Sequence, residues 1–293
     1  MEIARPRLLR WLVGTFLILI SWLIIGSILT GVTAAKFNLD LEVLASNDAQ
    51  TRQTLASYQP WQAATTILVS FIPLFLATLL LYRYLLRLPL RALFSRSERS
   101  LLSEIRVGAL TMGIILIVTG VPDMLANSES YKLNFNLEKF LPYLLIAVTL
   151  IPIQTSAEEV FFRGWIQQRL ENGRRSIWLV SILGGALFAL PHLANPEVNG
   201  ELIYALLGYG ATGFMFAWVS FRDRSIGIAL GAHAINNIMA ALVVTSEDSA
   251  LPSVSVWTTP AVAWLPAAVV SVATIPFFIW LSARLNRKAQ GAL

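Results

Sequence analysis

The stretch Ser156-Ala157-Glu158-Glu159-Val160-Phe161-Phe162-Arg163-Gly164 places two adjacent carboxylates and an arginine inside a part of the chain that is otherwise apolar. Neither Phe140–Ala157 before it nor Ser176–Leu193 after it contains Asp, Glu, Lys or Arg. An ionisable group at membrane depth costs about 2.5 to 3.5 kcal/mol on insertion scales and normally faces a protein interior or a wet cavity. The stretch therefore predicts a functional site inside a membrane protein.

The composition supports a membrane location. Of the 293 residues, 56% are hydrophobic and 13% are charged, and the mean hydropathy is +0.66. Soluble domains carry about 25% charged residues, so the composition excludes an ordinary soluble protein. The chain has no cysteine, which excludes disulfides and thiol chemistry. We expect its net charge of +5 to report membrane orientation rather than a nucleic-acid partner.

Apolar runs long enough to cross a bilayer, about 20 residues each, recur along the whole chain. We interpret the first as a retained helix, because it is too long for the apolar part of a signal peptide. We expect Pro73 to kink the second span, and the alternation of arginine and leucine over Arg83–Arg99 predicts an interfacial helix. The fold class is therefore all-α, a polytopic membrane bundle of about eight transmembrane helices. The predicted spans are approximately Trp11–Ala35, Ala63–Leu86, Ile105–Val121, Phe140–Leu170, Ser176–Pro191, Leu202–Phe221, Ser225–Thr245 and Trp257–Leu285.

The distribution of lysine and arginine tests this number of spans. With the N-terminus in the cytoplasm, 18 of the 22 basic residues fall on the cytoplasmic side. The other four are Lys36, Arg52, Lys132 and Lys139, and the last two outer loops contain none. Because cytoplasmic loops are enriched in Lys and Arg, we expect eight spans with both termini in the cytoplasm.

The charged residues of the opening stretch have different surroundings on a helix. Glu159 and Arg163 are four residues apart and share a face, so their simplest interpretation is an internal salt bridge that neutralises both charges. Glu158 lies about 100° around the helix from Glu159 and has no arginine on its own face. An unpaired carboxylate in a dry place is a candidate general base.

Both histidines of the chain, His192 and His233, lie in predicted spans. At about 1.5 Å per residue, Glu158 and His192 lie roughly 22 and 28 Å from the apex of the hairpin that joins their helices, and His233 lies about 13 Å from Arg224. His233 and Asn237 share a helix face and suit the stabilisation of an oxyanion. Each of these residues alone could make a helix–helix hydrogen bond, but together at membrane depth they favour a catalytic site.

The ordered motifs Glu158-Glu159-x-x-x-Arg163, Phe188-x-x-x-His192 and His233-x-x-x-Asn237 resemble those of the CPBP family, the CAAX-processing and bacteriocin-processing intramembrane proteases, also called the Abi family. Phe162-Arg163-Gly164 fits the usual extension of the first motif. The resemblance covers about Leu144–Leu242. It divides the chain into N-terminal transmembrane and interfacial helices without a family signal (1–140), CPBP-like catalytic helices (141–245), and a C-terminal transmembrane helix with a basic tail (246–293).

The resemblance implies an endopeptidase that is active within the bilayer. In such an enzyme Glu158 and His192 would activate the attacking water, and His233 and Asn237 would stabilise the tetrahedral oxyanion. Glu159 and Arg163 would shape the site. The family is often labelled metalloprotease, and zinc needs about three protein ligands, which Glu158, His192 and His233 could supply. Because the chain has no third histidine and no cysteine, we favour a mechanism without a metal cofactor and keep zinc as the alternative.

Two other functions are compatible with the sequence. A proton-coupled transporter or proton channel could use Glu158 and His192 as a proton relay, although the chain lacks the paired broken helices of a midplane substrate site. A catalytically idle relative could act as a membrane partner in bacteriocin immunity or protein sorting. For an active enzyme, the resemblance implies a peptide or protein substrate, either a prenylated CAAX protein or a membrane-anchored tail. We expect contact with membrane lipid and not with nucleic acid, and the plasma membrane as the location if the chain is prokaryotic.

Overall fold

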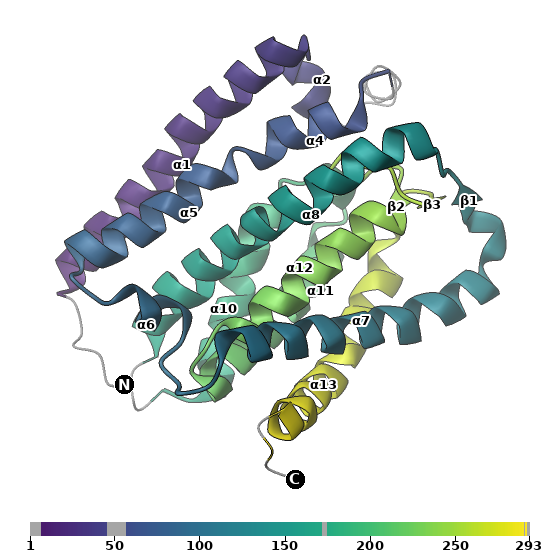
Figure 1. The fold of residues 1–293 in the computed structure, drawn as a ribbon. Helices are drawn as coiled ribbons and strands as arrows, with labels where there is room; N and C mark the ends of the chain where they lie inside the picture. The colour runs from purple at the N-terminus through teal and green to yellow at the C-terminus, as the bar shows by residue number, and fades with distance from the viewer. Residues whose placement is uncertain (1–6, 46–56, 172–174, 290, 292–293) are drawn as a thin grey trace.

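The computed structural model describes residues 7–45, 57–171, 175–289 and 291. Figure 1 shows a bundle of helices that run back and forth, so that α1 (Leu8–Phe37) begins and α13 (Trp264–Ala289) ends at the same end of the bundle. A small sheet lies toward the opposite end, with its strands in the order β1 (Lys132–Leu133), β3 (Trp257–Thr259), β2 (Val244–Ser246). The remaining elements are α2 (Leu41–Ala45), α4 (Pro60–Leu68), α5 (Phe71–Leu80), η1 (Leu81–Leu85), α6 (Leu90–Phe94), α7 (Leu101–Ala126), η2 (Ser128–Ser130), α8 (Leu137–Glu159), η3 (Val160–Gln167), α9 (Gln168–Leu170), α10 (Ile177–His192), η4 (Pro196–Val198), α11 (Leu202–Asp223) and α12 (Gly227–Leu242).

The number of membrane helices agrees with the sequence. Within the described residues, six helical segments are long and apolar enough to cross a membrane, and α10 and α12 are shorter apolar helices of 16 residues each. Six long and two short helices correspond to the eight predicted spans. The prediction of an all-α polytopic membrane bundle is confirmed, and the chain is an integral membrane protein.

The predicted kink in the second span is also present. Helix α4 ends at Leu68 and α5 begins at Phe71, two residues before Pro73. A proline ring clashes with the carbonyl of the residue four positions earlier, which here is Val69. The break therefore lies between the two helices rather than at the proline itself.

The predicted interfacial helix over Arg83–Arg99 is wrong. The second span continues as a π-helical turn to Leu85, Arg87 has a φ of 58°, and only the short helix α6 follows. Pro89 disfavours helical dihedrals at the residue before it, which separates α6 from the span. After α6, the hydroxyl of Ser95 accepts a hydrogen bond from the backbone N–H of Ser97, and such local bonds compete with helix formation.

The start of the last predicted span is wrong as well. Trp257–Thr259 pairs with its neighbours as strand β3, and the helix begins only at Trp264. Pro260 follows the strand directly, and the residue before a proline prefers extended dihedrals. The apolar run that begins at Trp257 therefore contains a strand and a turn before its helix.

Helices α7 and α12 cross at very close range through two glycines. A Cβ atom on Gly231 would lie 1.9 Å from the carbonyl oxygen of Ile105, and one on Gly108 would lie 2.0 Å from that of Ile228. Small residues allow helix backbones to approach closely in membrane bundles. This crossing fixes the helix that carries His233.

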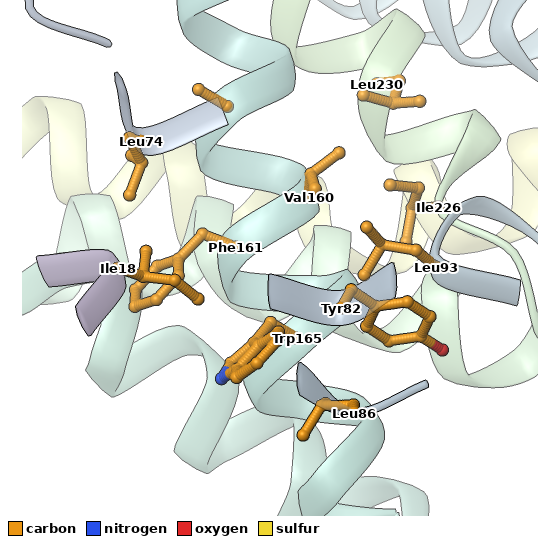
Figure 2. Close-up of a cluster of buried hydrophobic side chains, with 11 residues drawn as sticks. Ile18, Leu74, Tyr82, Leu86, Leu93, Val160, Phe161, Trp165, Ile226 and Leu230 are labelled. Carbon is orange, nitrogen blue, oxygen red and sulfur yellow. The ribbon is translucent and has the colours of Figure 1, made fainter. Parts of the chain in front are cut away.

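One hydrophobic cluster surrounds the π-helical segment η3, which follows the two glutamates. Figure 2 shows Phe161 on the side of Ile18 and Val160 on the side of Ile226. Trp165, on the same segment, is 2% exposed, and its indole N–H donates to the hydroxyl of Thr15 at 2.8 Å. The opening stretch is thus anchored to both neighbouring sides of the bundle.

Candidate active site

Glu158 and Glu159 lie at the point where helix α8 changes from α-helical to π-helical geometry. They are the last two residues of α8, and the π-helical segment η3 begins at Val160. Short π-helical segments are rare and often occur at functional sites. Glu158 is 6% exposed and Glu159 is fully buried, so the helix carries both carboxylates into the protein interior.

Glu159 joins Arg163 and His233 in one buried ion cluster. Its Oε1 atom lies 3.2 Å from the guanidinium of Arg163 and 2.8 Å from Nδ1 of His233. The salt bridge predicted from the spacing of Glu159 and Arg163 is present. The contact with His233 was not predicted, and it connects helix α12 to the end of α8.

Arg163 is 1% exposed and makes several contacts in the interior. Its guanidinium donates to the backbone carbonyl of Gly213 at 3.1 Å. Three aromatic rings surround it, with centroids 4.5 Å (Phe188), 5.5 Å (Phe216) and 5.8 Å (Phe162) from the guanidinium carbon. Aromatic faces attract a cation, the more so when it is desolvated. Arg163 therefore links η3, α10 and α11 through its contacts.

Glu158 has different partners from Glu159. Its Oε1 atom accepts a hydrogen bond from the side-chain amide of Gln154 at 2.7 Å, and its Oε2 atom lies 3.6 Å from Nε2 of His233. The amide oxygen of Gln154 in turn accepts from Asn237 at 3.3 Å. Asn236 donates to the amide oxygen of Asn237 at 3.1 Å, which orients the Asn237 amide group. Glu158, Gln154 and Asn237 thus form one polar chain across α8 and α12.

His192 ends helix α10 and is fixed by two contacts. Its Nδ1 atom lies 2.7 Å from the backbone carbonyl oxygen of Phe188, and its ring packs on that of Tyr209 with centroids 4.7 Å apart. Because a carbonyl can only accept a hydrogen bond, Nδ1 carries the proton and Nε2 is left with its lone pair. The hydroxyl of Tyr209 donates to Glu197 at 2.6 Å. Sequence reasoning grouped Glu158 with His192, whereas the side chains nearest to Glu158 are Gln154 and His233.

A cavity of about 360 Å³ brings most of these residues to one space. Glu158, His192, His233 and Asn237 all line it, whereas Glu159 and Arg163 are not among its lining residues and lie behind it. The other lining residues are apolar on α4 and α5 and a mixture of polar and apolar on α12 and on the loop after it. The site is therefore a largely apolar cavity with a few polar groups directed into it, which is a common form of small-molecule site.

The arrangement does not match a zinc site. Structural and catalytic zinc sites use at least three protein ligands about 2.0 to 2.3 Å from the ion. In the described part of the chain, no three side chains of the types His, Cys, Asp and Glu are placed so that they could hold one metal ion. Glu158, His192 and His233, the possible zinc ligands named from the sequence, are not placed so that they could bind one ion together.

Two contributors to the site were missed in the sequence. Gln154 is four residues before Glu158 in an apolar helix, so the same spacing argument that paired Glu159 with Arg163 could have found it. Tyr209 carries no such signal, because an aromatic residue in an apolar span is ordinary. Its role depends on the packing of α11 against the end of α10.

The comparison with known proteins agrees with the motifs. Residues 138–239 match the family described as type II CAAX prenyl endopeptidase Rce1-like. A protein of Bacillus subtilis (strain 168), named uncharacterized protein YyaK, is 29% identical over 216 residues, which make up 72% of each chain. No solved structure gives a significant match. All three motifs lie within the matched segment, so the resemblance is confirmed, and residues 138–239 of this integral membrane protein are similar to the Rce1-like CAAX prenyl endopeptidase family.

Proposed function

We propose that the protein is an intramembrane endopeptidase that hydrolyses a peptide bond in the cavity between α8, α10, α11 and α12. The observation that carries the proposal is the cavity itself. Four ionisable or polar side chains from three motifs, Glu158, His192, His233 and Asn237, line one space in the interior of an apolar bundle. A scaffold helix bundle would not need such groups, because each one is costly at membrane depth.

Glu158 and His192 activate the attacking water in this proposal. Glu158 has no salt bridge to an arginine. Its Oε1 atom accepts from the amide of Gln154 and its Oε2 atom lies 3.6 Å from Nε2 of His233, and in this proposal Oε2 takes the proton of the water. The Nε2 atom of His192, with its free lone pair, orients the same water. The water oxygen then bonds to the peptide carbonyl carbon while its proton passes to Glu158.

His233 and Asn237 stabilise the negative oxygen of the tetrahedral intermediate. The N–H at Nδ1 of His233 donates to the carboxylate of Glu159, and in the proposed mechanism Nε2 of the same ring donates to the oxyanion. The Asn237 amide supplies a second donor. When the intermediate collapses, the C–N bond breaks and Glu158 returns its proton to the leaving amine, so that atoms and charges balance.

Glu159 and Arg163 position these groups rather than touch the substrate. Glu159 holds the His233 ring through Nδ1, and Arg163 neutralises the charge of Glu159. The proposed steps use only side chains and one water. Zinc, the alternative, would have to be recruited by movement of the lining residues.

The test compares cells that carry the wild-type chain with cells that carry Glu158→Gln. New protein N-termini are mapped in both by mass spectrometry, and membrane amounts of the two variants are matched. We expect cleavage products that are present with wild type and absent with Glu158→Gln, together with the uncleaved precursor. Identical sets of N-termini would refute the protease and favour an idle relative. A change in proton flux without a change in N-termini would favour the transporter.

A further inference from the structure

The cavity extends from the site toward one end of the bundle only. On each helix that lines it, the lining residues begin at the site and continue toward the end that carries β1, β2, β3 and η4, which we call the strand end. On α12 they run from His233 to Ala241, and on α8 they include Gln154 but nothing beyond Glu158. The loops 193–201 and 243–263, both at the strand end, complete the lining with residues such as Asn195 and Leu251.

The opposite direction is closed by packed side chains. Immediately beyond Glu159, Val160, Phe161 and Trp165 are at most 5% exposed. They belong to one buried hydrophobic cluster with Ile226 and Leu230, at the start of α12, and Figure 2 shows Val160 on the side of these two residues. Arg163 fills the space between η3 and α11. A polypeptide could not reach Glu158 from this end without unpacking the core.

The two ends differ sharply in charge. Of the 19 lysines and arginines that the structure describes, 15 lie toward the end where α1 begins and α13 ends, which we call the basic end; the others are Lys36, Lys132 and Lys139 and the buried Arg163. The two loops that line the cavity contain neither lysine nor arginine, but they contain four carboxylates: Glu197, Glu201, Glu247 and Asp248. Because short cytoplasmic loops are enriched in Lys and Arg, the basic end is cytoplasmic and the strand end is extracytoplasmic.

From these observations, and building on the proposed protease activity, we infer that the site is entered from the extracytoplasmic side. Its substrate is a polypeptide segment exposed at that face, either an exported chain or the outer flank of a membrane protein. A prenylated C-terminus in the cytoplasm would meet the closed end. Of the loop carboxylates, Glu197 lines the cavity, whereas Glu247 pairs with Lys132 and Asp248 is buried and accepts from the backbone N–H of Val262. The negative charge of Glu197 at the mouth and of Glu158 inside favours basic segments over acidic ones, since clefts lined by one sign of charge concentrate the opposite sign.

The absence of cysteine in the wild-type chain permits a direct accessibility test. Single cysteines are introduced in the full-length protein at Ala240, which lines the cavity, and at Lys288, which is exposed near the end of α13. A small membrane-impermeant thiol reagent is added to intact bacterial cells and to permeabilised cells. We expect Ala240→Cys to be labelled equally in both, and Lys288→Cys only after permeabilisation. Labelling of Ala240→Cys only after permeabilisation, or in neither case, would overturn the inference.

The second measurement concerns the cleaved bonds themselves. The Glu158-dependent N-termini are placed on the known topology of each substrate. We expect them on the extracytoplasmic side, in segments with more Lys and Arg than Asp and Glu. Glu158-dependent cleavage on the cytoplasmic side would overturn the inference of extracytoplasmic entry but would still support the proposed protease activity. A complete lack of Glu158-dependent cleavage, with Ala240→Cys still labelled in intact cells, would overturn the proposed protease activity but would still support a cavity that opens to the extracytoplasmic side.

Discussion

Replacing Arg163 by alanine should damage the fold before it damages the chemistry. Arg163 is 1% exposed, lies 3.2 Å from Glu159, donates to the carbonyl of Gly213 and contacts three aromatic rings. Its removal leaves a buried carboxylate without its strongest partner and a buried carbonyl without its donor. Removing one partner of a buried ion pair typically costs about 3 to 5 kcal/mol. That is a large share of the roughly 5 to 15 kcal/mol by which a typical protein is stable.

The assay is the yield of monodisperse protein in mild detergent, with its thermal midpoint, at matched expression. Arg91→Ala is the control, because Arg91 forms an exposed ion pair with Glu98, and exposed pairs contribute little. We expect Arg163→Ala to give far less folded protein and a lower midpoint, Arg91→Ala to resemble wild type, and Arg163→Lys to lie between them. Arg163→Ala with wild-type yield and midpoint but no cleavage would refute this reasoning and make Arg163 a direct participant in catalysis.

Three further outcomes are expected. Gly231→Ala should destabilise the bundle by about 1 to 3 kcal/mol, as at other overpacked sites, because its Cβ would lie 1.9 Å from the carbonyl oxygen of Ile105. Gly113→Ala is the control, because Gly113 has open space around it. Equal thermal midpoints for the two variants would contradict the close crossing of α7 and α12. Asn237→Ala should fold normally and lose about 10² to 10³ in turnover, the usual cost of one oxyanion donor, and unchanged turnover would remove Asn237 from the site. A strong chelator should leave the activity of purified protein unchanged, and a loss that zinc restores would show that the metal is required.

The helices were predictable because long apolar runs have few alternatives in a membrane protein. The errors lie where local chemistry overrides hydrophobicity. Arg83–Arg99 alternates basic and apolar residues as an interfacial helix would, but Pro89 and the serines that follow limit it to the five residues of α6. Trp257 begins an apolar run, but strand pairing at the strand end and Pro260 delay the helix to Trp264. The π-helical geometry of η3 has no counterpart in the spacing of the residues.

The candidate site was predictable to the extent that it follows helix periodicity. The spacing of Glu159 and Arg163 predicted their contact, and the spacing of His233 and Asn237 predicted that both would face the same cavity. Contacts between helices were not predictable, because they depend on how the bundle packs. These include the hydrogen bond from His233 to Glu159 and the packing of Tyr209 against His192.

The central claim is that Glu158 takes the proton of the attacking water, and the turnover of Glu158→Gln tests it most directly. Glutamine keeps the size of the side chain and an oxygen that can accept from Gln154, but it cannot act as a base. For one substrate whose cleavage requires the wild-type protein, compared with membranes that lack the protein, initial rates are measured with equal amounts of folded wild type, Glu158→Gln and Asn237→Ala. We expect no detectable turnover for Glu158→Gln with retained substrate binding, and measurable residual turnover for Asn237→Ala. Near-normal turnover of Glu158→Gln would contradict the mechanism.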